Sequence, residues 1–324
     1  LIVAELLIFI AGLVGIWFGA HMVVDHALVI AKQLKISKLF VGLTILSIGT
    51  SLPEIFTHIN ASLKELAGSA ASNIAIGTNI GSNIVQITLI LGLLGFLTRI
   101  KSSKSVQHRD GLVMLGAIVA LFLMGLDGII SQVEGAILFF TYLVYLFYLY
   151  TKEEKLGEII SRKTKWTHKH FKNFTTHITI ILVGFAILQL SANAVVDTTL
   201  RFSNTLGIEQ SFFGLLIIGF ATALPEFTTA VMGVLKKSRD LSLGVLIGSN
   251  ITNPMMAMGI GAMIVDNPIS RSLVTFDIPF WFIVSAGVLL LFQKDKKLSK
   301  IGAATMIGSY IVYVLYKTYS VGLI

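Results

Sequence analysis

The chain has 324 residues, of which 55% are hydrophobic and only 13% are charged. This composition is too apolar for a soluble protein of two domains and indicates a polytopic membrane protein. The formal charge of +8 would suit a nucleic-acid partner only if the basic residues gathered on a polar domain, and the sequence has no such stretch. The chain has no cysteine, which excludes disulfides and thiolate metal sites.

Apolar runs of membrane-spanning length recur along the whole chain. They cover roughly residues 3–30, 39–63, 74–98, 111–126, 130–150, 175–200, 211–235, 242–265, 274–293 and 301–320. The first run lacks a basic start and continues directly into more helix, so we expect a first span and not a cleaved signal peptide. The fourth and fifth runs almost join near Asp127. We predict an all-α polytopic membrane protein with ten transmembrane helices.

The basic residues are concentrated in alternate connecting segments. These segments hold 21 of the 25 lysine and arginine residues, leaving Lys64, Arg201, Arg271 and Lys317 elsewhere. The positive-inside rule places the basic segments in the cytoplasm. Both termini are therefore predicted to lie on the extracellular side of the cell membrane. The longest segment, 151–173, carries His168 and His170, with His177 just after it. We interpret it as a cytoplasmic basic loop that holds the topology, in preference to a metal site.

A costly polar sequence interrupts the second apolar run. Gly49-Thr50-Ser51-Leu52-Pro53-Glu54 puts a proline and a carboxylate where lipid disfavours both. A charged side chain near the bilayer centre costs about 2.5–3.5 kcal/mol and usually marks an ion or substrate path. The proline removes the donor for the carbonyl four residues earlier, which leaves backbone oxygens near Ser47 to Thr50 able to bind something else.

A similar sequence returns 172 residues later, ending in Pro225-Glu226. The Gly81-Ser82-Asn83-Ile84 segment returns at an offset of 167, as Gly248 to Ile251. Five predicted helices separate the copies, and five is odd, so the two halves are predicted to lie in the membrane in opposite senses. The predicted units are a first five-helix repeat, 1–150 (motif 42–95), the loop 151–173, and a second five-helix repeat, 174–324 (motif 214–262).

Polar side chains in both copies follow helical spacing, and each set therefore shares one helix face. The four faces are Ser47, Thr50, Ser51, Glu54; Asn79, Ser82, Asn83, Gln86; Gly219, Thr222, Ala223, Glu226; and Leu246, Ser249, Asn250, Asn253. Isolated small polar residues in such helices are mostly packing contacts. Two glutamates that each follow a proline in an inverted copy are not explained by packing. We predict an all-oxygen site for a hard cation, calcium above all, around Glu54 and Glu226 with Thr50 and Thr222.

Three further titratable residues have open roles. His58 lies one turn beyond Glu54, but its repeat mate is Ala230, which favours a core or vestibule histidine. Asp25 and Asp197 are repeat mates near helix ends, where a gate, an accessory ion site and a simply solvated helix end are all consistent with the sequence.

The paired motifs Gly-Thr-Ser-Leu-Pro-Glu and Gly-Ser-Asn-Ile resemble the alpha-repeats of the sodium/calcium exchanger family, prokaryotic type, within the calcium/cation antiporter superfamily. The resemblance covers nearly the whole chain and implies a ten-helix antiporter in which long helices 1 and 6 slide to expose the site alternately. It implies calcium binding by Glu54 and Glu226 and shared calcium and sodium binding by Thr50 and Thr222. It further implies flanking sodium ligands at Ser51, Ser82 and Ser249, and backbone carbonyl ligands at Ser47 and Gly219.

Three positions depart from the family pattern. Gln86 stands where prokaryotic relatives commonly have Asn, Asn253 where some have Asp, and Ala223 has lost the hydroxyl that Ser51 keeps. The centre is therefore expected to hold two carboxylates, which balance one calcium or two sodium ions. The predicted function is calcium/sodium antiport by alternating access. The alternative is proton/calcium exchange with Glu54 or Glu226 carrying the proton, although the Gly-Asn-Ala-x-Glu sequence of the proton-coupled branch is missing.

Functions of other classes fit less well. A membrane-embedded enzyme needs a nucleophile with its base or a metal motif such as H-E-x-x-H, and the sequence contains neither, so we expect no enzyme and no cofactor. A passive channel does not account for the inverted repeat. The expected partners are calcium and sodium ions and the lipid bilayer, with no nucleic acid and no protein partner inferable from the sequence.

Overall fold

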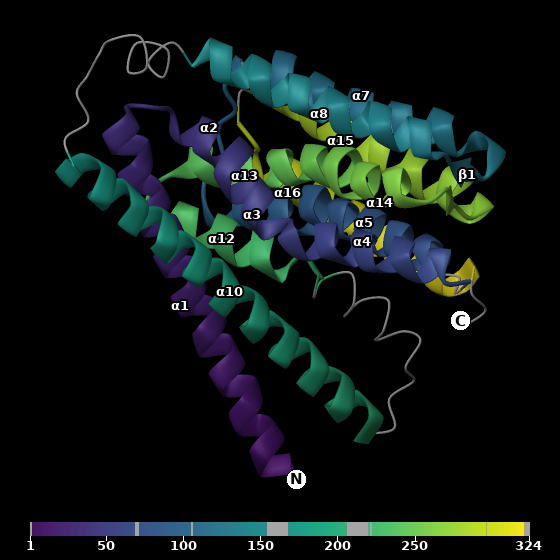
Figure 1. Ribbon diagram of the computed structural model, residues 1–324, viewed down its shortest axis with the longest axis horizontal. Coiled ribbons are helices and arrows are strands. Elements are labelled where there is room, and N and C mark those ends of the chain that lie inside the picture. The colour runs from purple at the N-terminus through teal and green to yellow at the C-terminus, as the bar shows by residue number, and fades with distance from the viewer. Residues whose placement is uncertain are drawn as a thin grey trace.

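The structure is a computed structural model that describes residues 2–68, 71–104, 106–153, 168–205, 220, 222–295 and 297–320. The described chain is helical apart from turns, short connections and two strands of two residues each. Two long helices, α1 (Ile2–Leu34) and α10 (His168–Thr205), lie side by side at an angle to the other helices (Figure 1). The prediction of an all-α protein is confirmed.

In the first half, several helices consist of α-helical pieces joined through short π-helical or 3-10 turns. After α1 these pieces are α2 (Lys38–Val41), η1 (Gly42–Leu46), α3 (Ser47–Thr50), α4 (Leu52–Leu66), α5 (Ser72–Val85), η2 (Gln86–Ile90), α6 (Leu91–Leu97), η3 (Val106–Asp110), α7 (Gly111–Met124), η4 (Gly125–Asp127) and α8 (Gln132–Lys152). Strand β1 (Ile129–Ile130) lies between η4 and α8.

The second half has the same kind of construction. After α10 its pieces are α12 (Leu224–Leu235), α13 (Arg239–Thr252), η5 (Asn253–Ala257), α14 (Met258–Ile264), strand β2 (Asn267–Pro268), η6 (Leu273–Asp277), α15 (Ile278–Asp295) and α16 (Lys300–Ser320). The part of the predicted seventh run that precedes Phe220, with the candidate residue Gly219, lies outside the described residues.

Six helices among the described residues are long and apolar enough to cross a membrane. They are Glu5–Leu34, Ser72–Leu97, Val106–Asp127, Gln132–Lys152, Phe174–Val195 and Leu273–Lys294. The bent pair Lys38–Thr50 and Leu52–Leu66 makes a seventh. All ten predicted apolar runs fall on helical segments as far as they are described. The chain is therefore a multi-pass membrane protein.

The join near Asp127 is resolved as a tight turn between two helices. Gly128 has φ +88°, a left-handed conformation that glycine adopts without steric cost and that ends the 3-10 turn at Asp127. Helix α8 then begins with a capping box, in which Ser131 and Glu134 each bond the other's backbone N–H. Local sequence thus separates the fourth and fifth runs.

The irregular turns of the helices recur at the offset found in the sequence. The π-helical segment η2 (Gln86–Ile90) matches η5 (Asn253–Ala257), and η3 (Val106–Asp110) matches η6 (Leu273–Asp277), each 167 residues apart. π-Helical turns are rare and are frequently found at functional sites. The two halves therefore repeat local backbone distortions as well as residue types.

Helix packing between the halves follows a reciprocal pattern. Helix α8 of the first half packs on α14 of the second, while α16 of the second half packs on α6 of the first. Close to the chain reversals, β1 pairs with β2 and an isolated bridge joins Lys101 to Lys297. Elements from the two halves are thus interleaved, with α3 packed against α13 and with α4 and α5 packed against η5.

The α1–α10 pair is held by close approach of small residues. A Cβ added to Gly12 would lie 3.2 Å from the Ser191 carbonyl, and one added to Gly19 would lie 2.9 Å from the Gly184 carbonyl. Such small residues let membrane helices approach closely enough for backbone packing to stabilise them. Beyond this pairing, α1 contacts α12, α2 and η1, and α10 contacts α3 and α12. The two long helices form one layer against the central bundle.

Candidate functional site

The two glutamates of the candidate site occupy matching breaks in their helices. Ser51 adopts φ −84°, ψ 1° between α3 and α4, and Ala223 adopts φ −89°, ψ 2° just before α12. Pro53 and Pro225 each fall in the first two positions of the following helix, where a missing N–H costs little. The break bends the α2–α3 segment against α4 by 43°. Glu54 and Glu226 consequently lie in the first turn of a helix, where its dipole favours negative charge.

Both carboxylates are buried in the protein interior. Glu54 is 6% exposed and Glu226 is fully buried, and none of their four carboxylate oxygens accepts a hydrogen bond from the described residues. Glu54 and Thr50 of the first half are electrostatic neighbours of Glu226. An isolated buried carboxylate is strongly disfavoured unless a cation or proton compensates its charge. The two glutamates therefore form a negative centre suited to a mobile cation.

Two other buried carboxylates in the described chain show the contrast. Asp110 accepts hydrogen bonds from Tyr145 at 3.1 Å and from the Arg109 guanidinium at 2.7 and 3.0 Å. Asp277 accepts from Tyr313 at 2.6 Å and from the Lys317 ammonium at 2.9 Å. Each of these aspartates has a fixed cation of the protein beside it, whereas Glu54 and Glu226 form no ion pair with a described residue.

Hydroxyl groups from both halves lie around the glutamates. The Thr50 and Ser249 hydroxyl oxygens are 3.5 Å apart, and the Ser47 hydroxyl donates to the Leu43 carbonyl at 2.6 Å. The Ser51 hydroxyl is buried and makes no hydrogen bond to a described residue. Because a hydroxyl oxygen has lone pairs to offer, this group adds neutral oxygen ligands beside the carboxylates.

An amide network connects the third and eighth predicted helices. Asn250 donates to the Gln86 carbonyl oxygen at 3.0 Å, and Gln86 donates to the Ser82 hydroxyl at 3.3 Å. Asn253 donates to the Asn83 carbonyl oxygen at 3.0 Å. The Asn250–Gln86 and Asn253–Asn83 bonds cross between α5–η2 and α13–η5, so they fix the two polar faces against each other. Gln86 is thereby held by protein contacts on both its oxygen and its nitrogen.

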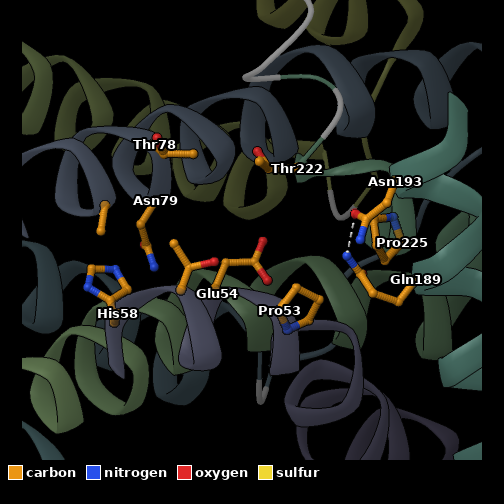
Figure 2. A pocket seen from close by; sticks show the side chains of 11 residues that line it. Pro53, Glu54, His58, Thr78, Asn79, Gln189, Asn193, Thr222 and Pro225 are labelled. Atoms are coloured by element: carbon orange, nitrogen blue, oxygen red, sulfur yellow. Dashed lines mark hydrogen bonds between the residues drawn. The ribbon is translucent and has the colours of Figure 1, made fainter. Parts of the chain in front are cut away.

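A cavity of about 170 Å³ reaches Glu54 from one side of the bundle. Figure 2 shows Glu54 at its centre, His58 and Asn79 toward one end, and Gln189 and Asn193 at the other. Its lining consists of Pro53, Glu54, Thr57, His58, Ala75, Thr78, Asn79, Gln189, Asn193, Thr222 and Pro225. Most of these positions belong to α4, the beginning of α5 and the second half of α10. Glu54 thus lies in the wall of a partly polar cavity.

The structure brings together the predicted site residues that it describes. Those whose side chains are buried at the junction of α3, α4, α5, α12 and α13 with η2 and η5 are Ser47, Thr50, Ser51, Glu54, Ser82, Gln86, Glu226, Ser249 and Asn253. Thr222 is half-buried and lines the cavity with Glu54. Gly219 lies outside the described residues.

The sequence did not predict several hydrogen-bond partners of the site, because they come from other helices. Tyr142 of α8 lies 2.9 Å from the Thr252 hydroxyl, and Trp281 of α15 donates to the Asn250 carbonyl oxygen at 2.9 Å. Gln189 and Asn193 of α10 are joined by a 2.9 Å hydrogen bond at the cavity. The i, i+4 spacing of these last two in an apolar run was a detectable signal, whereas Tyr142 and Trp281 had no motif to mark them.

The chemistry of the donor set is that of a hard-cation site. Its polar atoms are carboxylate, hydroxyl and amide oxygens, and no group of three or more His, Cys, Asp or Glu side chains converges among the described residues. Calcium favours such oxygen ligands and tolerates irregular geometry, while transition metals favour imidazole and thiolate. Two carboxylates supply the charge of one calcium ion or two sodium ions.

Comparison with known proteins agrees with this geometry. A family model described as sodium/calcium exchanger protein matches residues 4–151 and 176–319. The inner membrane protein YrbG of Escherichia coli (strain K12) is 28% identical over 94% of both chains. The sodium/calcium exchanger MaX1 of Methanosarcina acetivorans is 25% identical over 98% of this chain and all of its own.

Solved structures show the same fold. The sodium-calcium exchanger NCX_Mj, soaked with 2.5 mM Na⁺ and 0.1 mM Ca²⁺, superposes with a TM-score of 0.80 at 26% identity, covering 96% of this chain and 98% of that one. A second structure of NCX_Mj, soaked with 10 mM Na⁺ and no Ca²⁺, gives a TM-score of 0.82 at 25% identity. With a family model that matches most of the sequence, this chain belongs to the sodium/calcium exchanger protein family.

Proposed function

We propose that this protein is a secondary antiporter that exchanges sodium for calcium across the cell membrane. The observation that carries the proposal is the pair of buried glutamates, Glu54 and Glu226, whose carboxylates have no partner among the described residues. They lie in a chain of the sodium/calcium exchanger family. Proton/calcium exchange is the less favoured coupling, because the relatives and solved structures that match nearly the whole chain include named sodium/calcium exchangers.

The transported cations are assigned to one central group of oxygen atoms. Glu54 and Glu226 bind calcium, Thr50 and Thr222 contribute to both calcium and sodium binding, and Ser51, Ser82 and Ser249 hold sodium on either side. Ser47 and Gly219 contribute backbone carbonyls, and Gln86 and Asn253 complete the set. Support comes from the burial of the described members and from the contact between the Thr50 and Ser249 hydroxyls.

Ten spans in two inverted five-helix repeats form the proposed architecture. The recurrence of η2 in η5 and of η3 in η6 supports the repeat, as does the reciprocal packing of α8 on α14 and α16 on α6. The units are 1–150 and 174–324, joined by the cytoplasmic basic loop 151–173, and both termini face outward. In this orientation the cavity opens toward the outside, because its lining from α4, α5 and α10 lies on the extracellular side of Glu54.

Exchange follows from the cost of bare charge in a closed site. The α1–α10 layer contacts the bundle mainly through α12, α3, α2 and η1. This limited set of contacts suits the layer to slide as one body. Sliding would bury Glu54 and Glu226 away from water. This burial is energetically tolerable only when cations neutralise the two carboxylates. A loaded transporter can therefore change sides while an empty one cannot, and this prevents leak.

Flux in vesicles tests the function. Vesicles loaded with sodium are expected to take up calcium when the sodium gradient is directed outward, and Glu54→Gln is expected to stop this uptake because it removes half of the site's charge. Asp240→Asn is the matched control, since Asp240 is an exposed carboxylate at the start of α13. Uptake driven by a pH gradient alone, without a response to sodium, would establish the proton alternative instead.

A further inference from the structure

A cluster of charged side chains joins the α1–α10 layer to the central bundle, at the opposite end of α12 from Glu226. The Lys236 ammonium at the end of α12 lies 2.9 Å from Asp25 Oδ1 and 3.1 Å from Asp25 Oδ2 on α1. His21, one turn earlier on α1, lies 3.0 Å from Asp25 Oδ2. The ion-binding chemistry above uses none of these residues.

The cluster lies at the C-terminal end of α12, whereas Pro225 at the start of the same helix lines the cavity. Nearby, the Lys38 ammonium donates to the Ser238 hydroxyl at 3.0 Å, so α2 is tied to the turn that follows α12. Lys236 belongs to one of the basic segments assigned to the cytoplasm. The cavity to Glu54 lies on the other side of the glutamates. The Asp25–Lys236 ion pair therefore ties α1 to α12 at the end of the bundle away from the cavity.

The internal repeat supplies a counterpart for each member of the pair. At the offset of 172, Asp25 corresponds to Asp197 on α10, and Lys236 corresponds to Lys64 on α4. Lys64 is exposed. The sequence thus places a second lysine and aspartate, on the bundle and on the sliding layer, at the opposite end.

A third correspondence links the cluster to the cavity. His21 beside Asp25 corresponds at the same offset to Asn193, which lines the cavity on the outer side. When inverted repeats exchange their conformations, residues that line the open side come to match residues that seal the closed side. The position of His21 in the ion-pair cluster and of Asn193 in the cavity fits this exchange.

We propose that Asp25–Lys236 and Asp197–Lys64 are alternating gate ion pairs. The inner pair closes the cytoplasmic side in the conformation described here, and it separates when the α1–α10 layer slides. The outer pair forms in the inward-facing conformation and closes the extracellular side. This inference rests on the proposed alternating-access function. It names the contacts that favour the outward-facing or the inward-facing conformation. A partly exposed ion pair contributes modestly, so each gate shifts the equilibrium about two- to fivefold.

Cysteine labelling measures the two states, because the chain has no cysteine of its own. Thr78→Cys places a thiol in the cavity lining, where a membrane-impermeant maleimide added outside reacts only in the outward-facing state. In this background Asp25→Asn or Lys236→Gln is expected to slow labelling about two- to fivefold, because the inner gate is weakened. Lys64→Gln or Asp197→Asn is expected to speed it by a similar factor.

Swapping the charges of the two residues in a pair distinguishes a gate from a merely structural contact. Asp25→Lys combined with Lys236→Asp restores the pair in reverse and is expected to restore the labelling rate, as is Lys64→Asp combined with Asp197→Lys. Lys237→Gln, an exposed neighbour of Lys236, is the control and is expected to leave the rate unchanged. Shifts in the same direction for the inner and outer variants, or no shift for either, would overturn the gate.

The two proposals fail in different ways. If the Thr78→Cys background shows no sodium/calcium exchange although unsubstituted protein does, the label is moved to Thr57→Cys, which lines the same cavity. If unsubstituted protein does not exchange these ions, the proposed function is wrong. If exchange is normal and the labelling rate is unchanged in all four charge-removing variants, the proposed transport function stands and the proposed gate is wrong.

Discussion

The two halves of the chain share a backbone plan but carry different side chains at the centre. The helix breaks at Ser51 and Ala223 have nearly the same dihedral angles, yet only the first carries a hydroxyl. His58 lies buried one turn beyond Glu54, where the second half has Ala230. The first half therefore brings more polar atoms to the cavity, and the second half supplies the more deeply buried carboxylate. The repeat determines where the ligands lie, and local substitutions determine what each copy binds.

The halves also differ in how they neutralise their second buried carboxylate. Asp110 uses Arg109, its neighbour in sequence, whereas Asp277 uses Lys317 from another helix. The position that matches Arg109 is Phe276, whose ring stacks on Tyr316 at 3.9 Å between centroids. The same aspartate–tyrosine contact is thus kept by two different cations, which shows that charge neutralisation at this site matters more than its source.

The largest expected effect comes from removing either central carboxylate. Glu54→Gln and Glu226→Gln are each expected to abolish measurable sodium-driven calcium uptake, because one remaining charge cannot balance a divalent ion in a buried site. The measurement is calcium uptake into vesicles, with Asp240→Asn as control. If Glu54→Gln alone retained uptake, the halves would not be equal in charge compensation and the second carboxylate would suffice.

The next effect concerns stability. Arg109→Gln and Lys317→Gln each leave a buried aspartate without its cation, and we expect a loss of about 2 kcal/mol of unfolding free energy, discounted from the cost of a fully buried pair because both cations are partly exposed. Thermal unfolding of the detergent-solubilised protein measures it, with Lys237→Gln as control. Unequal losses would show that the sequence-local Arg109 pair and the long-range Lys317 pair are not equivalent.

A smaller effect is expected from the hydroxyl that distinguishes the two breaks. Ser51→Ala is expected to raise the sodium concentration for half-maximal exchange about tenfold, because the lost hydroxyl is a ligand to a charged ion. The double change Ser51→Ala with Ala223→Ser moves the hydroxyl to the second half and tests whether its side matters. A sodium dependence that Ser51→Ala leaves unaltered would remove this residue from the site.

The smallest expected effect concerns the amide network. Gln86→Asn shortens the side chain and withdraws its oxygen from the 3.0 Å bond donated by Asn250. The calcium concentration for half-maximal uptake is expected to rise about fivefold, since one neutral hydrogen bond contributes about 1 kcal/mol. Trp281→Phe, which removes the other bond to Asn250, should act in the same direction. A change in sodium dependence alone would instead mark Gln86 as a sodium ligand.

Much of the candidate site was predictable because its signals are local. A proline followed by a glutamate in an apolar run is costly wherever the chain folds, and its recurrence 172 residues later makes coincidence a poor explanation. Helical spacing then assigned Thr50, Ser51 and Glu54 to one face. The partners Tyr142, Thr252 and Trp281 were not predictable, because their contacts join helices far apart in sequence and follow no fixed spacing.

The sequence by itself determined the membrane class, the helical segments, the repeat and the two acids, since apolar length, proline and residue offset act on each segment separately. Only the tertiary structure decided which polar atoms are satisfied by protein and which are left for ions. Asp110 and Glu54 are both buried carboxylates, but one meets Arg109 and Tyr145 while the other meets a cavity. That difference depends on how helices pack across the two halves, and electrostatic compensation is a property of the assembled site.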